Sequence, residues 1–466
     1  MLNNCNFFNI AARLYALALK ASGLDVVVFC PFAYFSEDME RELGIRVASI
    51  RGAMMTKLDA LKTIFKSMAL MRALMYKMVQ ARAFLPKELR SFLESNLVVD
   101  VGNAIIVERS STYELIASLV HLYSLLLARL MNKPYLVVSK TIGPIKSPLI
   151  KFLTKSLLNR AVAISVRDLA SYNYVVNELR LKVPVYVAPD LAFKALNSLP
   201  KDVAIHVSHN EKNLKRVIGL NISPLLCRAM SWKERDFAKA FQGVISRLLE
   251  RGHHVVLVPT VLGPLKNPLN GRPEADLALV EAILEGLPII LRERVQCTSS
   301  HSEALKAIAG CDVLVASRLH AWLTAISYSV PAILVGFEHR FFAVAESLSL
   351  RDFVIDARKC DDSFKLAEEV FSRLEEALAN YESVRQRFSE VSKVAKAEAE
   401  LHVKLIQAYK ILERLRSARC VGCGTCVASC PEEALTMRVG RGGLQPWLDP
   451  ARCTGCGACV KVCPMT

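Results

Sequence analysis

The sequence predicts an α/β protein with two Rossmann-like lobes that face a cleft, followed by a long helical connector and a small metal-binding tail. Three observations support this prediction. Apolar strand patterns alternate with helix patterns in two blocks of the chain, which is typical of parallel sheets covered by helices on both faces. The stretch 337–421 contains neither Gly nor Pro. Eight of the 14 cysteines lie between Cys420 and Cys463.

Composition agrees with a large folded protein. The 466 residues suffice for about three domains, and an apolar fraction of 52% with 22% charged residues excludes a disordered polymer. The 60 Lys and Arg exceed the 44 Asp and Glu and give a net charge of +16. Such a charge favours phosphorylated small molecules, anionic lipid head groups or nucleic acid. The motifs described below point to the first class, and we expect no nucleic-acid partner.

The first lobe is expected over residues 1–196. A helix pattern at 9–21 precedes a strand at 25–30, so the strand that normally opens such a lobe is missing or very short. Further strands are predicted at 97–101, 135–139, 163–166 and 185–188, and helices at 113–130, 149–160 and 169–179. The break to the next lobe lies in the polar stretch 196–215.

A methionine-rich helix is predicted at 54–79. Its apolar residues recur every three or four positions and are accompanied by Lys and Arg. One interpretation is a basic amphipathic helix that contacts an anionic membrane or a partner. The other, which we favour, is a helix packed on its own lobe with Met as adaptable filler.

The second lobe is expected over 197–360, with strands at 217–222, 254–259, 289–291, 313–316 and 332–335 and helices at 233–251, 276–285, 302–309 and 320–329. A helical connector covers 361–416, and the tail covers 417–466. Uncharged stretches at 115–128 and 319–337 read as buried elements rather than membrane spans. Without a recognisable signal peptide, we expect a cytoplasmic protein, placed at the inner membrane surface if the helix at 54–79 binds lipid.

The tail holds two copies of one cysteine pattern, Cys-x-x-Cys-x-x-Cys-x-x-x-Cys-Pro. This spacing resembles that of the bacterial two-cluster ferredoxin, in which three close thiolates hold one 4Fe–4S cluster and the fourth reaches the other cluster. The resemblance implies one cluster on Cys420, Cys423, Cys426 and Cys463, and a second on Cys453, Cys456, Cys459 and Cys430. A pair of zinc sites is the alternative, but zinc gains nothing from a repeated third Cys and Cys-Pro.

Two clusters in one small domain imply electron transfer, and exposed clusters imply an intracellular, anaerobic setting. Tight backbone turns below the cluster sulfides are expected at four glycines, Gly422, Gly424, Gly455 and Gly457. The segment 442–453 resembles the ferredoxin insert of the β-subunit family of deazaflavin-dependent hydrogenases. That resemblance implies a redox protein partner.

The second lobe carries Ser-Arg-Leu-His directly after the strand at 313–316, so His320 opens a helix at the carboxyl edge of the sheet. Open α/β sheets bind ligands at this edge, and a helix start with Arg318 forms a seat for an anion. The alternative is a structural Arg–His pair that caps the helix.

Other motifs follow the remaining strands in order: Ser-Lys-Thr-Ile-Gly-Pro at 139–144, Ser-Val-Arg-Asp at 165–168, Ala-Pro-Asp at 188–190, Ile-Gly-Leu-Asn-Ile-Ser-Pro at 218–224 and Gly-Phe-Glu-His-Arg at 336–340. Together with Arg-x-His, they make residues 7–355 similar to the polysaccharide pyruvyl transferase family. The resemblance implies a two-lobed glycosyltransferase-B-like fold. It also implies transfer of pyruvyl from phosphoenolpyruvate to a saccharide acceptor.

Pyruvyl transfer requires a proton for the methylene carbon of phosphoenolpyruvate, a role that we assign to His320. Arg318 would clamp the carboxylate or phosphate. Arg340 or His339 would hold the leaving phosphate. Asp190 either orients the acceptor or caps a loop. Two further substrate-binding candidates are Asn221 and Lys140.

Two other functions remain open. The lobes could dock a redox partner while the tail transfers electrons, since pyruvyl transfer itself consumes no electrons. A sugar-nucleotide glycosyltransferase with the same fold is the second alternative, and a bound nucleotide would support it.

Overall fold

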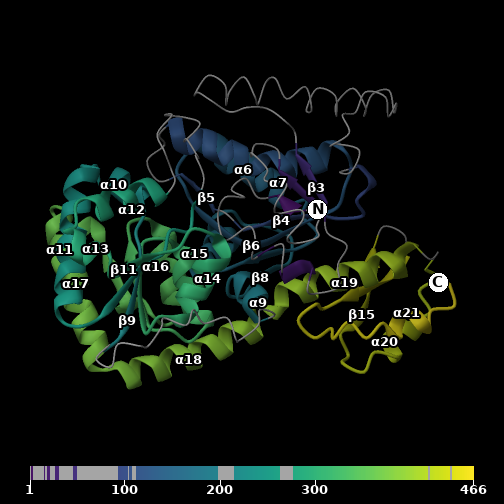
Figure 1. Ribbon diagram of the computed structural model, residues 1–466. Helices are drawn as coiled ribbons and strands as arrows, with labels where there is room; N and C mark the ends of the chain where they lie inside the picture. The colour runs from purple at the N-terminus through teal and green to yellow at the C-terminus, as the bar shows by residue number, and fades with distance from the viewer. Residues whose placement is uncertain are drawn as a thin grey trace.

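The computed structural model describes residues 2–3, 15, 18–20, 27–30, 46–49, 93–102, 104–107, 112–197, 215–262, 276–417, 420–440 and 443–465. The helix predicted at 54–79 lies outside these ranges, as does most of the break at 196–215. Two α/β lobes lie side by side, a helical run passes beneath both, and a small tail follows at one end (Figure 1).

The first lobe is built on an eight-stranded parallel sheet in the order β3-β2-β1-β4-β6-β7-β8, with β5 beside β6. Its strands are β1 Leu2–Asn3, β2 Val27–Cys30, β3 Arg46–Ser49, β4 Val98–Val101, β5 Ala104–Val107, β6 Tyr135–Ile145, β7 Ile164–Val166 and β8 Val185–Val187. The opening strand is therefore present but only two residues long, and it pairs with β2 and β4.

Both faces of this sheet are apolar because alternate strand residues point to opposite sides. Val98 and Val137 join one buried cluster, whereas Val99 and Val138 join another. The first cluster also includes residues of α6 Thr112–Leu130 and α7 Pro148–Leu158, and α7 begins at a proline, which suits the first helical position. The other described helices of this lobe are α8 Leu169–Asn173, its π-helical continuation Tyr174–Glu178 and α9 Ala192–Asn197.

The second lobe contains a six-stranded parallel sheet in the order β11-β10-β9-β12-β13-β14. Its strands are β9 Val217–Asn221, β10 His254–Leu257, β11 Val295–Cys297, β12 Val313–Ala316, β13 Ala332–Gly336 and β14 Val354–Asp356. Its helices are α10 Pro224–Ala229, α11 Glu234–Glu250, α12 Asp276–Glu285, α13 Ile289–Arg292, α14 His301–Gly310, α15 Leu319–Ser327 and α16 His339–Ser347, with short 3-10 turns at Arg351–Phe353 and Ala357–Lys359.

One predicted strand of this lobe is wrong. The run at 289–291 forms the single helical turn α13, in which Ile289 and Ile290 are 70% and 73% exposed. The strand lies a few residues later, at β11, which pairs only with β10 at the edge of the sheet. An edge strand needs little apolar character. The Val-Gln-Cys sequence of β11 is therefore a weaker strand pattern than the Ile-Ile-Leu run at 289–291.

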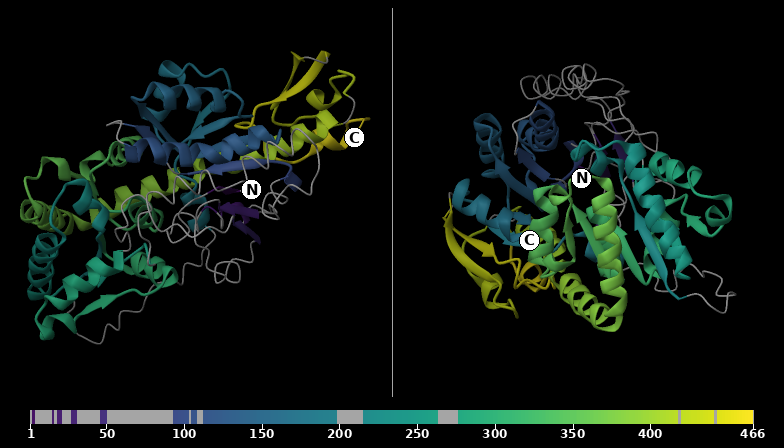
Figure 2. Two further views of the ribbon diagram at one scale, coloured as in Figure 1. Left: turned by 90° about the horizontal axis from the view of Figure 1, so that it is seen from above. Right: turned by 90° about the vertical axis from the view of Figure 1, so that its left-hand side faces the viewer.

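The connector consists of α17 Ser363–Ala379, α18 Tyr381–Glu398 and α19 Glu400–Ser417. The first helix packs on α11 of the second lobe, and α18 contacts α15 and α9. The third returns across the first lobe, where it contacts β6, and then reaches the tail (Figure 2). The expected long helical connector is therefore confirmed, and it crosses from one lobe to the other.

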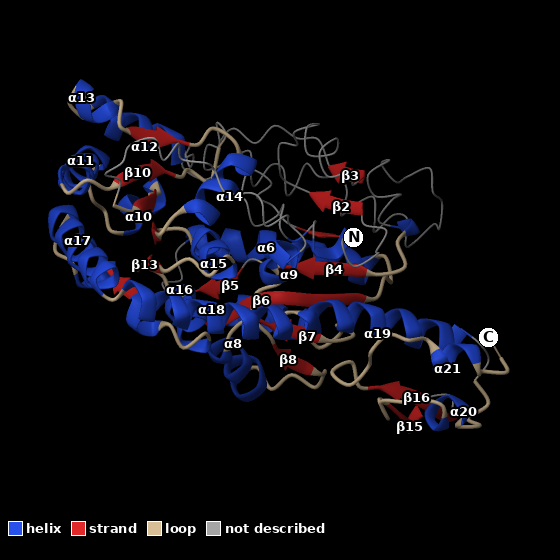
Figure 3. Cartoon of the chain, turned by 60° about the horizontal axis from the view of Figure 1, so that its bottom comes forward, coloured by secondary structure: helices blue, strands red, loops and turns tan. Residues whose placement is uncertain are grey.

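The tail contains α20 Thr425–Ala428, α21 Ala458–Lys461 and an antiparallel hairpin of β15 Leu435–Gly440 and β16 Gly443–Leu448. Ala408, Ile411 and Leu415 of α19 share its small apolar core. The tail therefore packs as one unit with α19, whose preceding residues pack on the first sheet (Figure 3). Among the described residues, no helix is long and apolar enough to span a membrane.

Candidate functional site

His320 lies in the first turn of α15, where the second lobe faces the first. Its position follows from the buried strand β12, because the chain leaves the carboxyl edge of the sheet and starts the helix at once. The imidazole is 16% exposed. Its Nε2 lies 2.8 Å from the hydroxyl of Tyr15 and 3.8 Å from Oδ2 of Asp190, so two groups of the first lobe hold one nitrogen.

The direction of these hydrogen bonds follows from the acceptors. The Tyr15 hydroxyl donates to Oδ2 of Asp190 at 3.1 Å, since an ionised carboxylate can only accept. Its oxygen therefore accepts from Nε2–H of His320. Burial and the charge of Asp190 raise the pKa of Tyr15 well above its usual value, so the hydroxyl keeps its proton. Nδ1 of His320 is thus the ring nitrogen outside this network.

Asp190 is a buried, ionised carboxylate that follows β8. Burial opposes its ionisation, but interaction with His320 and the charge of Arg167 hold its pKa well below the usual range. Its Oδ2 accepts from Nη1 of Arg167 at 2.8 Å, and its Oδ1 accepts from the backbone N–H of Ala192 at 2.9 Å. One oxygen therefore caps the loop, and the other faces the histidine.

The surroundings of His320 lower the pKa of its imidazole. Burial is the main cause, the positive charges of Arg167 and Arg340 act in the same direction, and Asp190 opposes them. The imidazole is therefore neutral near pH 7 until a negative charge arrives. An anionic ligand would raise this pKa and convert the imidazole into a proton donor.

Tyr15 fits above Gly102, directly after β4. A side-chain carbon at Gly102 would lie 2.3 Å from the Tyr15 ring, and the glycine has a φ of +65°, which other residues rarely adopt. The absence of a side chain there allows the ring to approach the end of the strand. Gly102 thereby places the hydroxyl that bridges His320 and Asp190.

In the Ser-Val-Arg-Asp motif, Arg167 contacts Asp190, whereas Asp168 stabilises the fold. Arg167 is 2% exposed, and besides Asp190 its Nε donates to the Thr141 hydroxyl at 2.7 Å. Asp168 accepts from the backbone N–H of Ser171 and so caps α8. It also accepts from the Thr141 hydroxyl at 3.0 Å. These bonds connect the ends of β6, β7 and β8 below the site.

The charges of cationic side chains from both lobes act on a second histidine, His121 of α6. Lys140 forms a buried ion pair with Asp100, and Arg340 forms a half-buried ion pair with Glu338. Burial first, and then the charges of Lys140 and Arg340, lower the pKa of His121 to about 3. Its buried Nδ1 has no hydrogen-bond partner within the described part of the chain. The imidazole of His121 is therefore neutral near pH 7.

Arg318 and Asn221 belong to a separate network inside the second lobe. Nε and Nη2 of Arg318 donate to Oδ1 of the buried Asp276 at 3.1 and 2.7 Å. The Asn221 side chain donates to the Val258 carbonyl and the Thr260 hydroxyl, and accepts from the backbone of Arg318. Arg318 therefore faces a carboxylate of its own lobe, and Asn221 fixes the start of α15.

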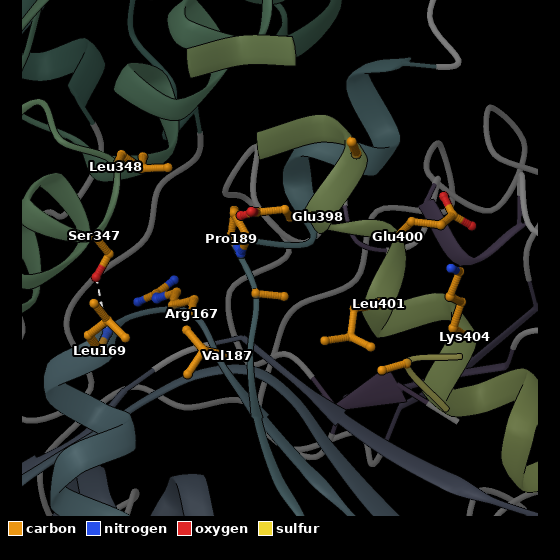
Figure 4. A pocket seen from close by; sticks show the side chains of 13 residues that line it. Arg167, Leu169, Val187, Pro189, Ser347, Leu348, Glu398, Glu400, Leu401 and Lys404 are labelled. Carbon is orange, nitrogen blue, oxygen red and sulfur yellow. Dashed lines mark hydrogen bonds between the residues drawn. The ribbon is translucent and has the colours of Figure 1, made fainter. Parts of the chain in front are cut away.

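A cavity of about 500 Å³ lies where the lobes, the connector and the tail meet. Arg167 and Pro189 line it from the first lobe and Ser347 from the second, while Lys404 and Ala451 line it from the connector and the tail (Figure 4). Its size is within the usual range for ligand pockets, about 300–1,000 Å³. It shares Arg167 with the Asp190 network.

The tail cysteines form two groups that match the implied cluster ligands. Cys420, Cys423, Cys426 and Cys463 together line one cavity, closed by apolar side chains such as Leu415. Three of these thiols belong to the first repeat and one to the second. This arrangement fits a cubane held by four thiolates.

The second group gathers around Cys453 and Cys459, which are buried. Burial, followed by the nearby Cys430 and Cys456, raises the pKa of Cys453. Backbone N–H groups of Ala434 and Gly455 point to Sγ of Cys430 and Cys453 at 3.3 and 3.4 Å. The four expected glycines have φ between +71° and +75°, so the tight turns exist as the sequence indicated. Bound clusters would provide one-electron transfer there.

The structure thus brings His320 and Asp190 together, the charge of Arg340 acts on His320, and His339 opens α16 beside Arg340. Lys140 pairs with Asp100, and Arg318 and Asn221 make the contacts within the second lobe described above. Sequence reasoning missed Tyr15 and His121 as functional candidates. His121 had a signal, because it interrupts the uncharged apolar stretch 115–128.

Comparisons with known proteins match both parts of the chain. Residues 18–339 match the family model described as polysaccharide pyruvyl transferase, and residues 419–466 match the 4Fe-4S dicluster domain. The amylovoran biosynthesis protein AmsJ of Erwinia amylovora is 21% identical over 315 residues, which are 65% of this chain and 71% of AmsJ.

Solved structures confirm the two-lobed fold. S. aureus MnaA, in a structure with UDP, gives a TM-score of 0.54 at 12% identity, covering 88% of this chain and 96% of MnaA. A UDP-N-acetylglucosamine 2-epimerase gives 0.52 at 14% identity, with coverage of 88% and 95%. At such low identity, these likenesses concern the fold alone.

Proposed function

Because this chain belongs to the polysaccharide pyruvyl transferase family and is a transferase with a two-cluster 4Fe–4S tail, we propose that it moves a pyruvyl group from phosphoenolpyruvate to a saccharide. The observation that carries the proposal is the His320–Tyr15–Asp190 network, which both lobes build together. In this proposal, Nδ1 of His320 faces the substrate. Nε2 of His320 faces the Tyr15 hydroxyl and the Asp190 carboxylate.

The reaction balances without a redox step. A proton adds to the methylene carbon of phosphoenolpyruvate and converts it into a methyl group. One acceptor hydroxyl forms a bond to the neighbouring carbon, and a second hydroxyl replaces the phosphate there. The two hydroxyl protons leave with the phosphate or through the acid that supplied the first proton. The products are a cyclic ketal and inorganic phosphate.

His320 supplies the methylene proton from Nδ1 in this proposal. Its lowered pKa disfavours the protonated imidazole, but phosphoenolpyruvate brings several negative charges that raise this pKa. Asp190 and Tyr15 stabilise the imidazolium at Nε2. After the transfer, the neutral imidazole accepts a proton from an attacking hydroxyl, so one residue serves both steps.

In this proposal, phosphoenolpyruvate is held by cationic side chains other than Arg318, which pairs with Asp276. Arg340 and Lys140 are close enough to His121 for their charges to act on it, and Arg340 also acts on His320. We therefore place the phosphate or carboxylate between Arg340 and His121. Arg318 supports this site by holding the start of α15, a change from the clamp role expected from the sequence.

The tail supports a second candidate function, electron transfer to or from a protein partner. Cys423 and Cys456 are exposed, so bound clusters would lie within reach of a partner. Cluster ligation by the eight cysteines and docking of a redox partner are separate from pyruvyl transfer. The glycosyltransferase alternative is supported only by a likeness of fold, and it predicts that the protein binds UDP.

The test mixes the protein with phosphoenolpyruvate labelled at its central carbon and methyl glycosides that carry 4,6- or 3,4-diols. We expect release of phosphate together with a labelled ketal in the product. His320→Gln should abolish most of the turnover. His253→Gln is a matched control, because His253 precedes β10 at the opposite, amino edge of the sheet. No ketal with any diol, combined with hydrolysis of UDP-sugars, would favour a glycosyltransferase.

A further inference from the structure

His402 connects the helix that carries the tail with the first lobe. It lies in α19, is 0% exposed, and makes two hydrogen bonds to residues more than 200 positions away. Its Nε2 lies 2.6 Å from the carbonyl oxygen of Pro189, and its Nδ1 lies 2.9 Å from Oγ of Ser165. A carbonyl can only accept, so Nε2 carries the hydrogen and Nδ1 accepts from the serine.

Both partners of His402 precede a residue of the Asp190 network. The Pro189 carbonyl belongs to the peptide unit that enters Asp190, so the bond from His402 fixes the plane of that unit. Ser165 lies in β7, two residues before Arg167, whose guanidinium pairs with Asp190 at 2.8 Å. The imidazole therefore contacts both chain segments from which the ion pair projects.

The contact is confined to one side of α19. Val403 and Ile406 pack with Leu136 and Val138 of the first sheet, and Glu400 pairs with Lys194. On another side of the same turn, Leu401 and Lys404 line the cavity of about 500 Å³. Packing thus holds the helix against the sheet, while His402 is the group that reaches the loop before Asp190.

We propose that His402 is a positioning residue, which aligns Asp190 and through it His320, so that the connector of the iron–sulfur tail is part of the transferase site. The inference rests on the proposed function but goes beyond the family match, because that match ends at residue 339. It also gives the fused tail a structural link to the site.

The experiment compares two replacements in the full chain with its clusters reconstituted. His402→Gln keeps an N–H donor near the position of Nε2 and can still bond the Pro189 carbonyl. His402→Asn keeps an acceptor near Nδ1 for Ser165 but loses the bond to Pro189. Both replacements are neutral amides; they differ by one methylene group and in which of the two hydrogen bonds they keep.

We expect kcat for phosphoenolpyruvate turnover to fall about 10²-fold in His402→Asn, since misplacement by about 1 Å has effects of this size. The KM for phosphoenolpyruvate should change by less than about threefold, because the donor-binding cations are untouched. The kcat of His402→Gln should be about tenfold higher than that of His402→Asn. Equal kcat values for the two folded variants would overturn the proposal.

A second readout does not depend on turnover. The groups facing His320 are Tyr15, Asp190 and Arg167 from the first lobe and Arg340 from the second. Asp190 raises the pKa of His320, so loosening Asp190 in His402→Asn should lower that pKa further, as followed by NMR of labelled histidine. An unchanged titration in both variants would contradict the positioning role. If wild-type protein turns over no phosphoenolpyruvate, the proposed function fails, and this titration still decides the role of His402.

Ser165→Ala covers the case in which His402→Asn does not fold. It removes the bond to Nδ1 of His402, together with a 3.4 Å bond that Ser165 Oγ accepts from the backbone N–H of Ser139. We expect kcat to fall about fivefold, the size of one neutral hydrogen bond. A folded Ser165→Ala protein with unchanged kcat and an unchanged His320 titration would count against the proposal.

Discussion

The hydroxyl of Tyr15 lies 2.8 Å from Nε2 of His320, although 305 positions of sequence separate the two residues. The bond crosses between the lobes, and the same hydroxyl donates to Asp190. A single phenol therefore connects the proposed acid with the carboxylate that stabilises its charged form. Under the proposed function, the relative position of the lobes is therefore a condition for catalysis.

Removing this phenol tests its role. Tyr15→Phe should lower kcat by about tenfold or more, because one buried hydrogen bond to a charged group is worth about 1.5–3 kcal/mol. Gly102→Ala should produce a similar loss by pushing the ring away, and the strained backbone should also lower the free energy of unfolding by about 1 kcal/mol. Steady-state kinetics and urea unfolding measure both effects. Fully additive losses of kcat in the double variant would show that Gly102 does not act through Tyr15.

The Arg318–Asp276 pair predicts an effect on stability rather than on binding. Arg318→Lys replaces two donors to the buried carboxylate with one, so the free energy of unfolding should fall by about 1–3 kcal/mol. The KM for phosphoenolpyruvate should change little. Arg358→Lys is the matched control, because its pair with Asp356 is half exposed and contributes at most about 1 kcal/mol. A large rise in KM with unchanged stability would restore the clamp role.

His121 should make the protein less stable in acid. Its pKa of about 3 in the folded chain lies below the unfolded value, so the unfolded chain binds more protons between these values. The free energy of unfolding therefore falls as the pH drops, by about 2 kcal/mol between pH 7.5 and pH 5 from this group. Urea unfolding at both pH values should show a smaller difference in His121→Phe. An identical difference would mean that His121 is not desolvated.

Paired serine replacements test the crossed ligation of the clusters. If Cys463 belongs with Cys420, then Cys420→Ser with Cys463→Ser should remove one cluster and leave about four iron atoms per chain. Cys420→Ser with Cys430→Ser should damage both clusters. Iron analysis after anaerobic reconstitution decides, with Cys360→Ser as a control that keeps about eight. The opposite result would show that each repeat binds its own cluster.

Much of the fold could be predicted because its strands are short, apolar and regularly spaced. The limits of β12 and α12 agree with the sequence pattern, since both lie between clear polar boundaries. Strand β6 extends beyond the prediction to Ile145, because Lys140 and Thr141 are buried polar residues that hide a continuing strand. Their partners, Asp100 and Arg167, come from neighbouring strands and are invisible to a local pattern.

The site could be predicted only in part, because contacts between distant segments leave no local sequence pattern. Residues that follow strands, such as His320 and Asp190, could be found because parallel strands end at one edge. The bridge through Tyr15 depends on how the two lobes face each other, which no local pattern contains. The contact of His402 depends on a helix that returns from the second lobe to the first, so its partners could not be predicted from the connector alone.

The most direct test of the account is the fate of the proton from His320. Turnover of phosphoenolpyruvate with a diol acceptor in D₂O should place one deuterium in the methyl group of the ketal, as read by mass spectrometry. His320→Gln should reduce the rate by about 10²–10⁴-fold while thermal stability stays nearly unchanged. A ketal formed at the wild-type rate by His320→Gln would contradict the central claim, as would a folded wild-type protein that forms no ketal from phosphoenolpyruvate.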